Sequence, residues 1–247
     1  MSKLTVHGAK AASAATAKSD IVVVPLFKNE DLSSSSSEVN VAAGDVLQRA
    51  ITIGDADAKL GKITTMVGSG NITRIMSVGC GDRASFNLEA QLSVTGAVSR
   101  ALASSKAKNA IVVGDPIADD KDALAQFLEF LGRDMAMACY HYTATLGTPK
   151  PGPTFSKLTV AVDGISAAKA KQSLSVGATI GNGANLTREL VNLPGNVCTP
   201  SYLAKEGRAL GRKYDKLSVS VLDEKKMASM GTVSYTHLTL PTRRFVG

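Results

Sequence analysis

Short runs of apolar, mostly β-branched residues alternate with longer helical patterns along this chain, and the alternation constrains its fold more than any other feature. Ile21–Phe27 is predicted to form a buried strand, and its Pro25 indicates a position near a sheet edge or at a strand end. Ala110–Val113 and Leu158–Val162 are predicted to be further strands. The sequence therefore predicts an α/β fold.

Two further strands should form a hairpin. Lys62–Val67 and Ile72–Val78 flank Gly68–Asn71, a hairpin-type turn, so these strands are expected to be antiparallel neighbours. A helix capped by Asp82 or Ser85 then runs to about Lys106 and leads to the strand at Ala110. This strand–helix–strand unit favours a right-handed crossover and parallel pairing. The predicted sheet is therefore mixed.

Three more segments have helical patterns. A short helix is expected over Asp45–Ile53, and a longer one runs from Asp119 and Asp120 through about Tyr142 with apolar residues three and four apart. The third, Ser166–Leu193, is ambiguous from propensity alone. Its pattern is interrupted by three glycines, each of which costs about 1 kcal/mol against Ala in a helix interior: Gly177, Gly181 and Gly183.

Two segments are predicted to be loops. Asn29–Asn40 contains five consecutive serines, Ser33–Ser37, which offer nothing to bury and indicate a flexible loop. Pro149–Pro153 holds three prolines and should be a linker, because proline cannot continue a helix. Residues 1–19 contain no acidic residue and no arginine, so a flexible leader is favoured over an organelle transit peptide.

Composition narrows the classes of function. The chain of 247 residues has a formal net charge of +7, but it has no Trp and only 4% aromatic residues, which argues against stacking on single-stranded nucleic acid. Diffuse basic charge is typical of a solvated surface. The basic residues gather mainly in one predicted helix and beyond it: Lys205, Arg208, Arg212, Lys213, Lys216, Lys225, Lys226, Arg243 and Arg244.

The cysteines and the apolar runs indicate the compartment. Cys80, Cys139 and Cys198 are odd in number and far apart, so neither a disulfide framework nor a zinc knuckle is predicted, and a reducing compartment fits. No stretch reaches the roughly 18 apolar residues that a membrane span requires. We therefore expect no membrane association.

The segment Asn185–Ala204 carries the most specific signal in the sequence. It reads Arg-Glu-Leu-Val-Asn-Leu-Pro-Gly-Asn-Val-Cys-Thr-Pro-Ser-Tyr-Leu-Ala from position 188, and it resembles the stretch of the leucyl aminopeptidase family (peptidase family M17) that leads into the catalytic domain. Thr199 is expected to cap a helix with Pro200 at its first position. Val219–Gly231 continues the resemblance as a strand followed by a short helix.

The resemblance implies a domain order and settles the ambiguous helix. It implies an N-terminal mixed-sheet α/β sandwich, similar to the macro domain, with a long linking helix into a truncated α/β catalytic domain. After Gly231 the sequence departs from the family and resembles translated adapter sequence, so we expect a chimeric or truncated gene. The expected parts are a leader at 1–19, the N-terminal domain at 20–165, the linking helix at 166–193, the start of the catalytic domain at 194–231 and a non-native tail at 232–247.

The resemblance also implies a chemistry. Family members are two-metal exopeptidases, often hexameric and cytoplasmic, that use zinc, manganese or magnesium to release N-terminal residues, often leucine, from peptides. The Asp-, Glu- and Lys-containing motifs that hold those metals do not occur in this sequence. We therefore expect an inactive fragment of such an enzyme, with no catalytic, cofactor-binding or metal-binding residue of its own.

No other motif suggests a site. The carboxylate pairs are expected to be structural or solvated, the histidines lack metal-ligand spacing, Cys198 lacks a partner histidine, and two glycine pairs fall short of a dinucleotide fingerprint. These residues are Asp55 and Asp57, Asp119 and Asp120, Asp223 and Glu224; His7, His141 and His237; Gly68 and Gly70, Gly181 and Gly183.

Two other classes of function stay open. The macro-like domain is an alternative binding module for ADP-ribose-like ligands or DNA, although no glycine-rich phosphate loop or basic recognition motif stands out. The other alternative is a domain that only mediates packing between subunits.

Overall fold

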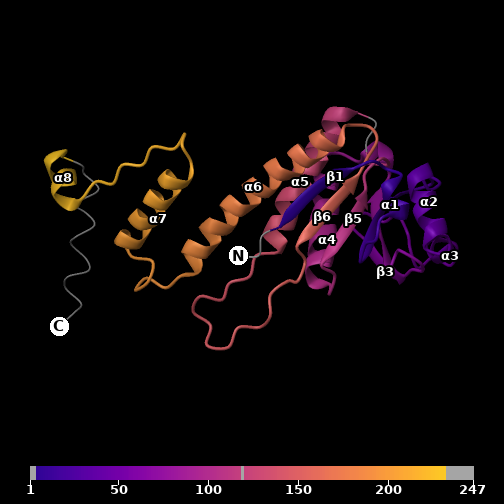
Figure 1. Ribbon diagram of the computed structural model, residues 1–247, viewed down its shortest axis with the longest axis horizontal. Helices are drawn as coiled ribbons and strands as arrows, with labels where there is room; N and C mark the ends of the chain where they lie inside the picture. The colour runs from indigo at the N-terminus through magenta and orange to yellow at the C-terminus, as the bar shows by residue number, and fades with distance from the viewer. Residues whose placement is uncertain (1–3, 118–119, 232–247) are drawn as a thin grey trace. The chain divides into compact units, whose positions relative to one another are not determined.

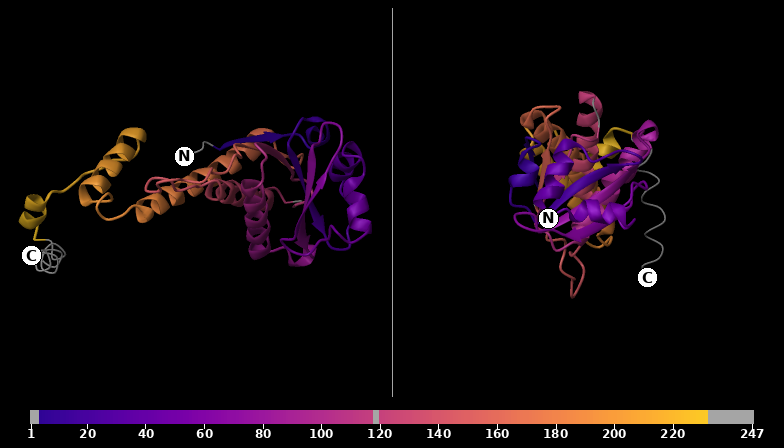
Figure 2. Two further views of the ribbon diagram at one scale, coloured as in Figure 1. Left: turned by 90° about the horizontal axis from the view of Figure 1, so that it is seen from below. Right: turned by 90° about the vertical axis from the view of Figure 1, so that its right-hand side faces the viewer.

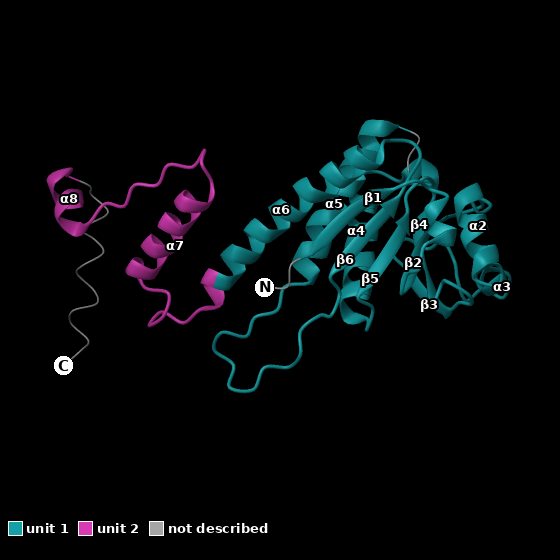
Figure 3. Cartoon of the chain, viewed as in Figure 1, with its two compact units in different colours: residues 1–189 teal, residues 190–247 magenta. Residues whose placement is uncertain are grey.

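The computed structural model describes residues 4–117 and 120–231 of the chain. The expected tail at 232–247, which includes His237, lies outside the described residues, and so does Asp119. The chain divides into two compact units, residues 1–189 and 190–247 (Figure 3).

The first unit is built on one six-stranded sheet with the strand order β1-β6-β5-β2-β4-β3 (Figure 1). Four of its strand pairs are parallel, and only β3 runs antiparallel to its neighbour β4, so the predicted hairpin and mixed sheet are confirmed. The strands are β1 (Thr5–Ala9), β2 (Ile21–Phe27), β3 (Ile63–Val67), β4 (Arg74–Gly81), β5 (Asn109–Val113) and β6 (Lys157–Ala161).

Helices cover both faces of this sheet (Figures 1 and 2). Strand β2 is buried along its whole length, and its alternate residues enter two separate cores. Val23 packs with α4, α5 and α6, whereas Val24 packs with α1, α2 and α3. The helices are α1 (Ser13–Thr16), α2 (Ser34–Ala42), α3 (Val46–Thr52), α4 (Leu88–Ser104), α5 (Lys121–Ala138) and α6 (Ala167–Asn192).

The two strands of the predicted strand–helix–strand unit run parallel as expected, but they do not pair with each other. Strands β4 and β5 are parallel, yet β2 lies between them and pairs with both. The prediction for Pro25 was half right, because β2 is central rather than at an edge. Its pairing with β5 ends at Val23, so Pro25 pairs only with Val78 of β4. Proline has no backbone N–H to donate, so it is tolerated where one side of a strand makes no hydrogen bonds to a neighbouring strand.

The leader at residues 1–19 was wrongly predicted to be flexible. Thr5–Ala9 forms strand β1, which pairs in parallel with β6. Gly8 is needed there, because a Cβ atom at this position would collide with the backbone carbonyl of Ala167. Further along, Ala14 is fully buried against the sheet. The described part of this segment, residues 4–19, therefore belongs to the fold.

The serine-rich segment was also wrongly predicted to be a loop. Ser34–Ala42 forms α2, and Ser33 caps it by accepting a hydrogen bond from the backbone N–H of Ser36 at 3.2 Å. Val39 is fully buried in the core behind the sheet. The helix forms because one cap and a few buried residues outweigh the low propensity of serine.

The second unit contains α7 (Pro200–Lys213) and α8 (Glu224–Ser229). Thr199 caps α7 by accepting the backbone N–H of Tyr202 at 3.3 Å, with Pro200 in the first turn as predicted. The strand expected from Val219 to Glu224 is absent from the structure of this segment, and Glu224 begins α8 instead. A strand needs a partner, and no other strand lies among the described residues of this unit.

Glycines allow α5 and α6 to approach each other closely. A Cβ atom on Gly177 would collide with the carbonyl of Glu129, and one on Gly181 would lie 2.5 Å from the carbonyl oxygen of Arg133. A Cβ atom on Gly183, two residues further on, would have nothing within 4 Å. Two of the three glycines that interrupt the helical pattern of α6 are therefore packing positions.

The cysteines of the two units differ in burial. Cys80 and Cys139 are 1% and 7% exposed, and burial raises the pKa of their thiols to about 12 and about 11. Cys198 is half-buried in the loop between α6 and α7. Thiol reactivity follows the thiolate fraction and access.

We predict that Gly177→Ala lowers the free energy of unfolding by about 1–3 kcal/mol, because its methyl group would push α6 away from α5. The matched control Gly183→Ala should raise it by about 1 kcal/mol, since alanine favours the helix and meets open space. Urea unfolding of the full chain, followed by circular dichroism at the helix band, measures both. Equal effects of the two substitutions would contradict close packing at Gly177.

We predict that iodoacetamide at pH 8 alkylates Cys198 at least ten times faster than Cys80 or Cys139. With a pKa of about 12, only about one Cys80 thiol in ten thousand is ionised at that pH. Peptide mass spectrometry of timed samples gives the three rates. In urea all three should react alike, and native labelling of Cys80 at the rate of Cys198 would refute its burial.

Candidate functional site

The carboxyl ends of β2 and β5 are the place where a ligand would be expected in a sheet of this topology. After β2 the chain continues to β3 and β4 on one side of the sheet, and after β5 it continues to β6 on the other, so the strand order reverses between β2 and β5. Ligands of open α/β sheets bind in the crevice at such a switch point. A cavity of about 240 Å³ lies there, lined in part by Phe27, Glu30 and Asp115.

The charges of this switch-point crevice are mostly negative. Arg83 donates two hydrogen bonds of 2.7 Å to the carboxylate of Glu30, and its guanidinium lies 3.8 Å from the ring centre of Phe27. The hydrogen bond from Arg83 holds the pKa of Glu30 below its usual value. With Asp31 and Asp115 also in the lining, three acidic residues face one arginine. This lining disfavours a phosphate-bearing ligand such as ADP-ribose.

The pair of Arg83 and Glu30 was not among the residues singled out from the sequence. The two residues are 53 positions apart and belong to no local motif. Only the sheet topology, which brings the loops after β2 and β4 together, could have indicated it.

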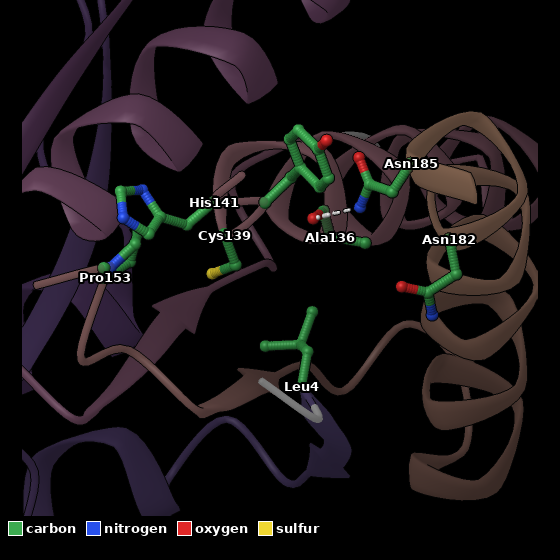
Figure 4. Close-up of a pocket in the computed structure, with 9 residues that line it drawn as sticks. Leu4, Ala136, Cys139, His141, Pro153, Asn182 and Asn185 are labelled. Atoms are coloured by element: carbon green, nitrogen blue, oxygen red, sulfur yellow. Dashed lines mark hydrogen bonds between the residues drawn. The ribbon is translucent and has the colours of Figure 1, made fainter. Parts of the chain in front are cut away.

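A second cavity, of about 210 Å³, lies between the end of α5 and α6 (Figure 4). Three of its side chains are bonded to the backbone. His141 Nε2 lies 2.7 Å from the carbonyl oxygen of Lys150, Asn185 donates to the carbonyl of Ala136 at 2.9 Å, and Cys139 donates weakly to Phe155. The cavity therefore presents no nucleophile or general base ready for chemistry.

The carboxylates noted in the sequence serve local structure. Asp57 accepts hydrogen bonds from Lys62 Nζ and the backbone N–H of Lys59, both at 2.7 Å, and these bonds lower its pKa. Asp120 caps α5 through the backbone N–H of Ala123. Asp223 caps α8 in the same way. Asp55 is exposed, and Glu224 is the first residue of α8.

The structure brings no metal-ligating set together in its described part. His7 lies on β1, where burial and then Lys157 and Lys171 lower its pKa, and His141 lies beyond α5. Over residues 4–117 and 120–231, no group of three or more His, Cys, Asp or Glu side chains is placed to hold a metal ion. These residues therefore do not fit a pair of divalent cations.

The remaining glycine pair also has a structural role. Gly70 lies in the loop between β3 and β4 with a φ of +59°, a conformation that favours glycine, and a Cβ atom on Gly68 would collide with the carbonyl of Ile72. Among the described helices, none is long and apolar enough to cross a membrane.

Comparison with known proteins gives two family matches along this chain. Residues 23–147 match the family model of the cytosol aminopeptidase family, N-terminal domain, and residues 185–239 match that of its catalytic domain. A probable cytosol aminopeptidase of Alkalilimnicola ehrlichii is 31% identical over 229 residues, which cover 91% of this chain and 46% of the relative. The chain thus spans about half the length of the curated relatives it matches.

Solved structures agree on the fold. A tomato leucine aminopeptidase variant superposes with a TM-score of 0.74 at 19% identity, over 93% of this chain and 46% of that one. The bottromycin maturation enzyme BotP in complex with Mn gives a TM-score of 0.57 at 17% identity, over 79% of this chain and 36% of that one. The arrangement of strands and helices and both family matches thus point the same way, and the chain belongs to the cytosol aminopeptidase family.

Proposed function

We propose that this chain is the N-terminal part of a leucyl aminopeptidase that releases N-terminal residues, often leucine, from peptides. The observation that carries this proposal is the succession of two family matches on one chain, an N-terminal domain at 23–147 followed by the beginning of a catalytic domain at 185–239. Helix α6 connects the two matched regions. A binding module that stood alone would give no reason for the second match.

Hydrolysis in the whole enzyme would depend on two divalent cations, zinc, manganese or magnesium, which polarise the scissile carbonyl and activate water. The described residues do not fit such ions, so we assign none of this chemistry to them. Support for a divalent metal comes from the family and from BotP, a neighbour of the same fold that is described in complex with Mn. We propose that the metal-binding residues belong to the half of the relatives that this chain does not span.

The cellular setting is also a proposal. The relatives are named cytosol aminopeptidases, which supports the cytoplasm, whereas an organelle leader loses its support because residues 5–9 belong to the sheet. We propose a hexamer of the whole enzyme, with the N-terminal domain contributing to subunit packing. Among the alternatives, the acidic crevice argues against ADP-ribose, and DNA binding rests on the net charge of +7 and on exposed basic residues of α7.

We predict that the purified 247-residue chain does not hydrolyse leucine p-nitroanilide with added manganese. A chimera that joins residues 1–231 to the remaining catalytic part of the Alkalilimnicola ehrlichii relative should hydrolyse it at a rate that chelation by EDTA abolishes. The intact relative is the positive control, and circular dichroism of the 247-residue chain confirms that it is folded. Manganese-dependent turnover by the 247-residue chain would contradict the proposed location of the metal ligands.

A further inference from the structure

An open depression of about 510 Å³ lies between α4 and α5, on a different part of the first unit from the switch-point crevice. We call it the α4–α5 depression. Helix α4 contributes residues at helical spacing along one face, α5 contributes the opposite wall, and α6 contributes a single side chain. The lining includes the polar and aromatic residues Ser99, Arg100, Arg133, Asp134, Tyr140 and Arg188.

Three arginines and one carboxylate line this depression. Arg133 forms an ion pair with Asp134, with Nη2 at 2.7 Å from Oδ1, and Thr95 donates to the other carboxylate oxygen at 2.6 Å. The carboxylate of Asp134 is therefore committed to Arg133 and Thr95. It leaves the charges of Arg100 and Arg188 uncompensated within the lining.

The two other arginines differ in how they are held. Arg188 donates to the carbonyl of Met137 at 3.1 Å and to Asn185 at 3.2 Å, and its guanidinium lies 4.4 Å from the ring centre of Tyr140. It is thus fixed in place while several of its five N–H donors stay available. The side chain of Arg100 is exposed, and its guanidinium makes no hydrogen bond or ion pair with another described residue. A nearby carboxylate, Glu189, accepts from the hydroxyl of Tyr140 at 2.9 Å.

Ser99 gives an independent indication of a ligand. It is 1% exposed, it lines the depression, and its hydroxyl has no hydrogen-bond partner among the described residues. A buried hydroxyl without a partner lowers stability, so such groups in native proteins are usually satisfied by water or by a ligand. Gly96, one turn earlier, leaves room for Arg100, since a Cβ atom there would lie 3.0 Å from its Nη1.

We propose that the α4–α5 depression binds a compact oxyanion with two or more negative charges, whose source is a phosphate compound or a dicarboxylate. Arg100 and Arg188 would supply the positive charge, and the planar guanidinium matches both kinds of oxyanion. Ser99 would donate its hydroxyl to the ligand, and Arg133, fixed by Asp134, would form the far wall. This site is separate from peptide hydrolysis and does not depend on the proposed function.

The test is isothermal titration of the 247-residue chain with inorganic pyrophosphate and with malonate at constant ionic strength. We expect saturable binding at one site, weakened at least tenfold by Arg100→Gln. Arg212→Gln on α7 removes the same charge outside the depression and should leave affinity unchanged. Stronger binding of pyrophosphate assigns the phosphate source, and stronger binding of malonate assigns the dicarboxylate.

Ser99→Ala separates a binding role from a purely structural one. Removing an unsatisfied hydroxyl should leave the thermal midpoint unchanged or higher, and it should weaken binding of the preferred anion several-fold. Circular dichroism of each variant shows that it is folded. The proposal is overturned if neither anion binds saturably, or if Arg100→Gln and Arg212→Gln weaken binding equally. Unchanged affinity in Ser99→Ala would remove the hydroxyl from the site.

Discussion

Burial of β2 on both faces is the constraint on which the rest of the first unit depends. Because side chains alternate along a strand, Val23 and Val24 belong to different cores, and each core must be closed by its own layer of helices. A shift of one residue would exchange the two sets of side chains. The positions of α4, α5 and α6 on one face and of α1, α2 and α3 on the other follow from this single strand.

The sequence predicted the elements whose signals are local and missed those that depend on distant partners. The hairpin and the cap at Thr199 follow from patterns within a few residues. So does helix α5, although it ends at Ala138 and not near Tyr142 as predicted. Strand β1 was missed because its partner β6 lies about 150 residues away. The strand expected at Val219 failed for the opposite reason, since a β-branched pattern without a neighbouring strand has nothing to pair with.

In this domain the position of a crevice in the fold does not determine which ligand its side chains can bind. The crevice at the ends of β2 and β5 has the topology of a ligand site, yet the pair of Glu30 and Arg83, together with Asp115, gives it the wrong charge for phosphate. Basic side chains gather instead between α4 and α5, away from the strand ends. The topology of the sheet therefore indicates where a pocket forms and not which ligand it binds.

The serine tract illustrates how burial controls access to a side chain. A run such as Ser33–Ser37 looks like a target for kinases, but Ser35 and Ser36 are buried and Ser33 holds the first turn of α2. A kinase must accommodate its substrate as an extended, accessible segment, and a phosphate group would not fit beneath α2 once attached. In the folded protein this tract is therefore closed to modification at the hydroxyls of Ser35 and Ser36, and only unfolding of α2 would expose them.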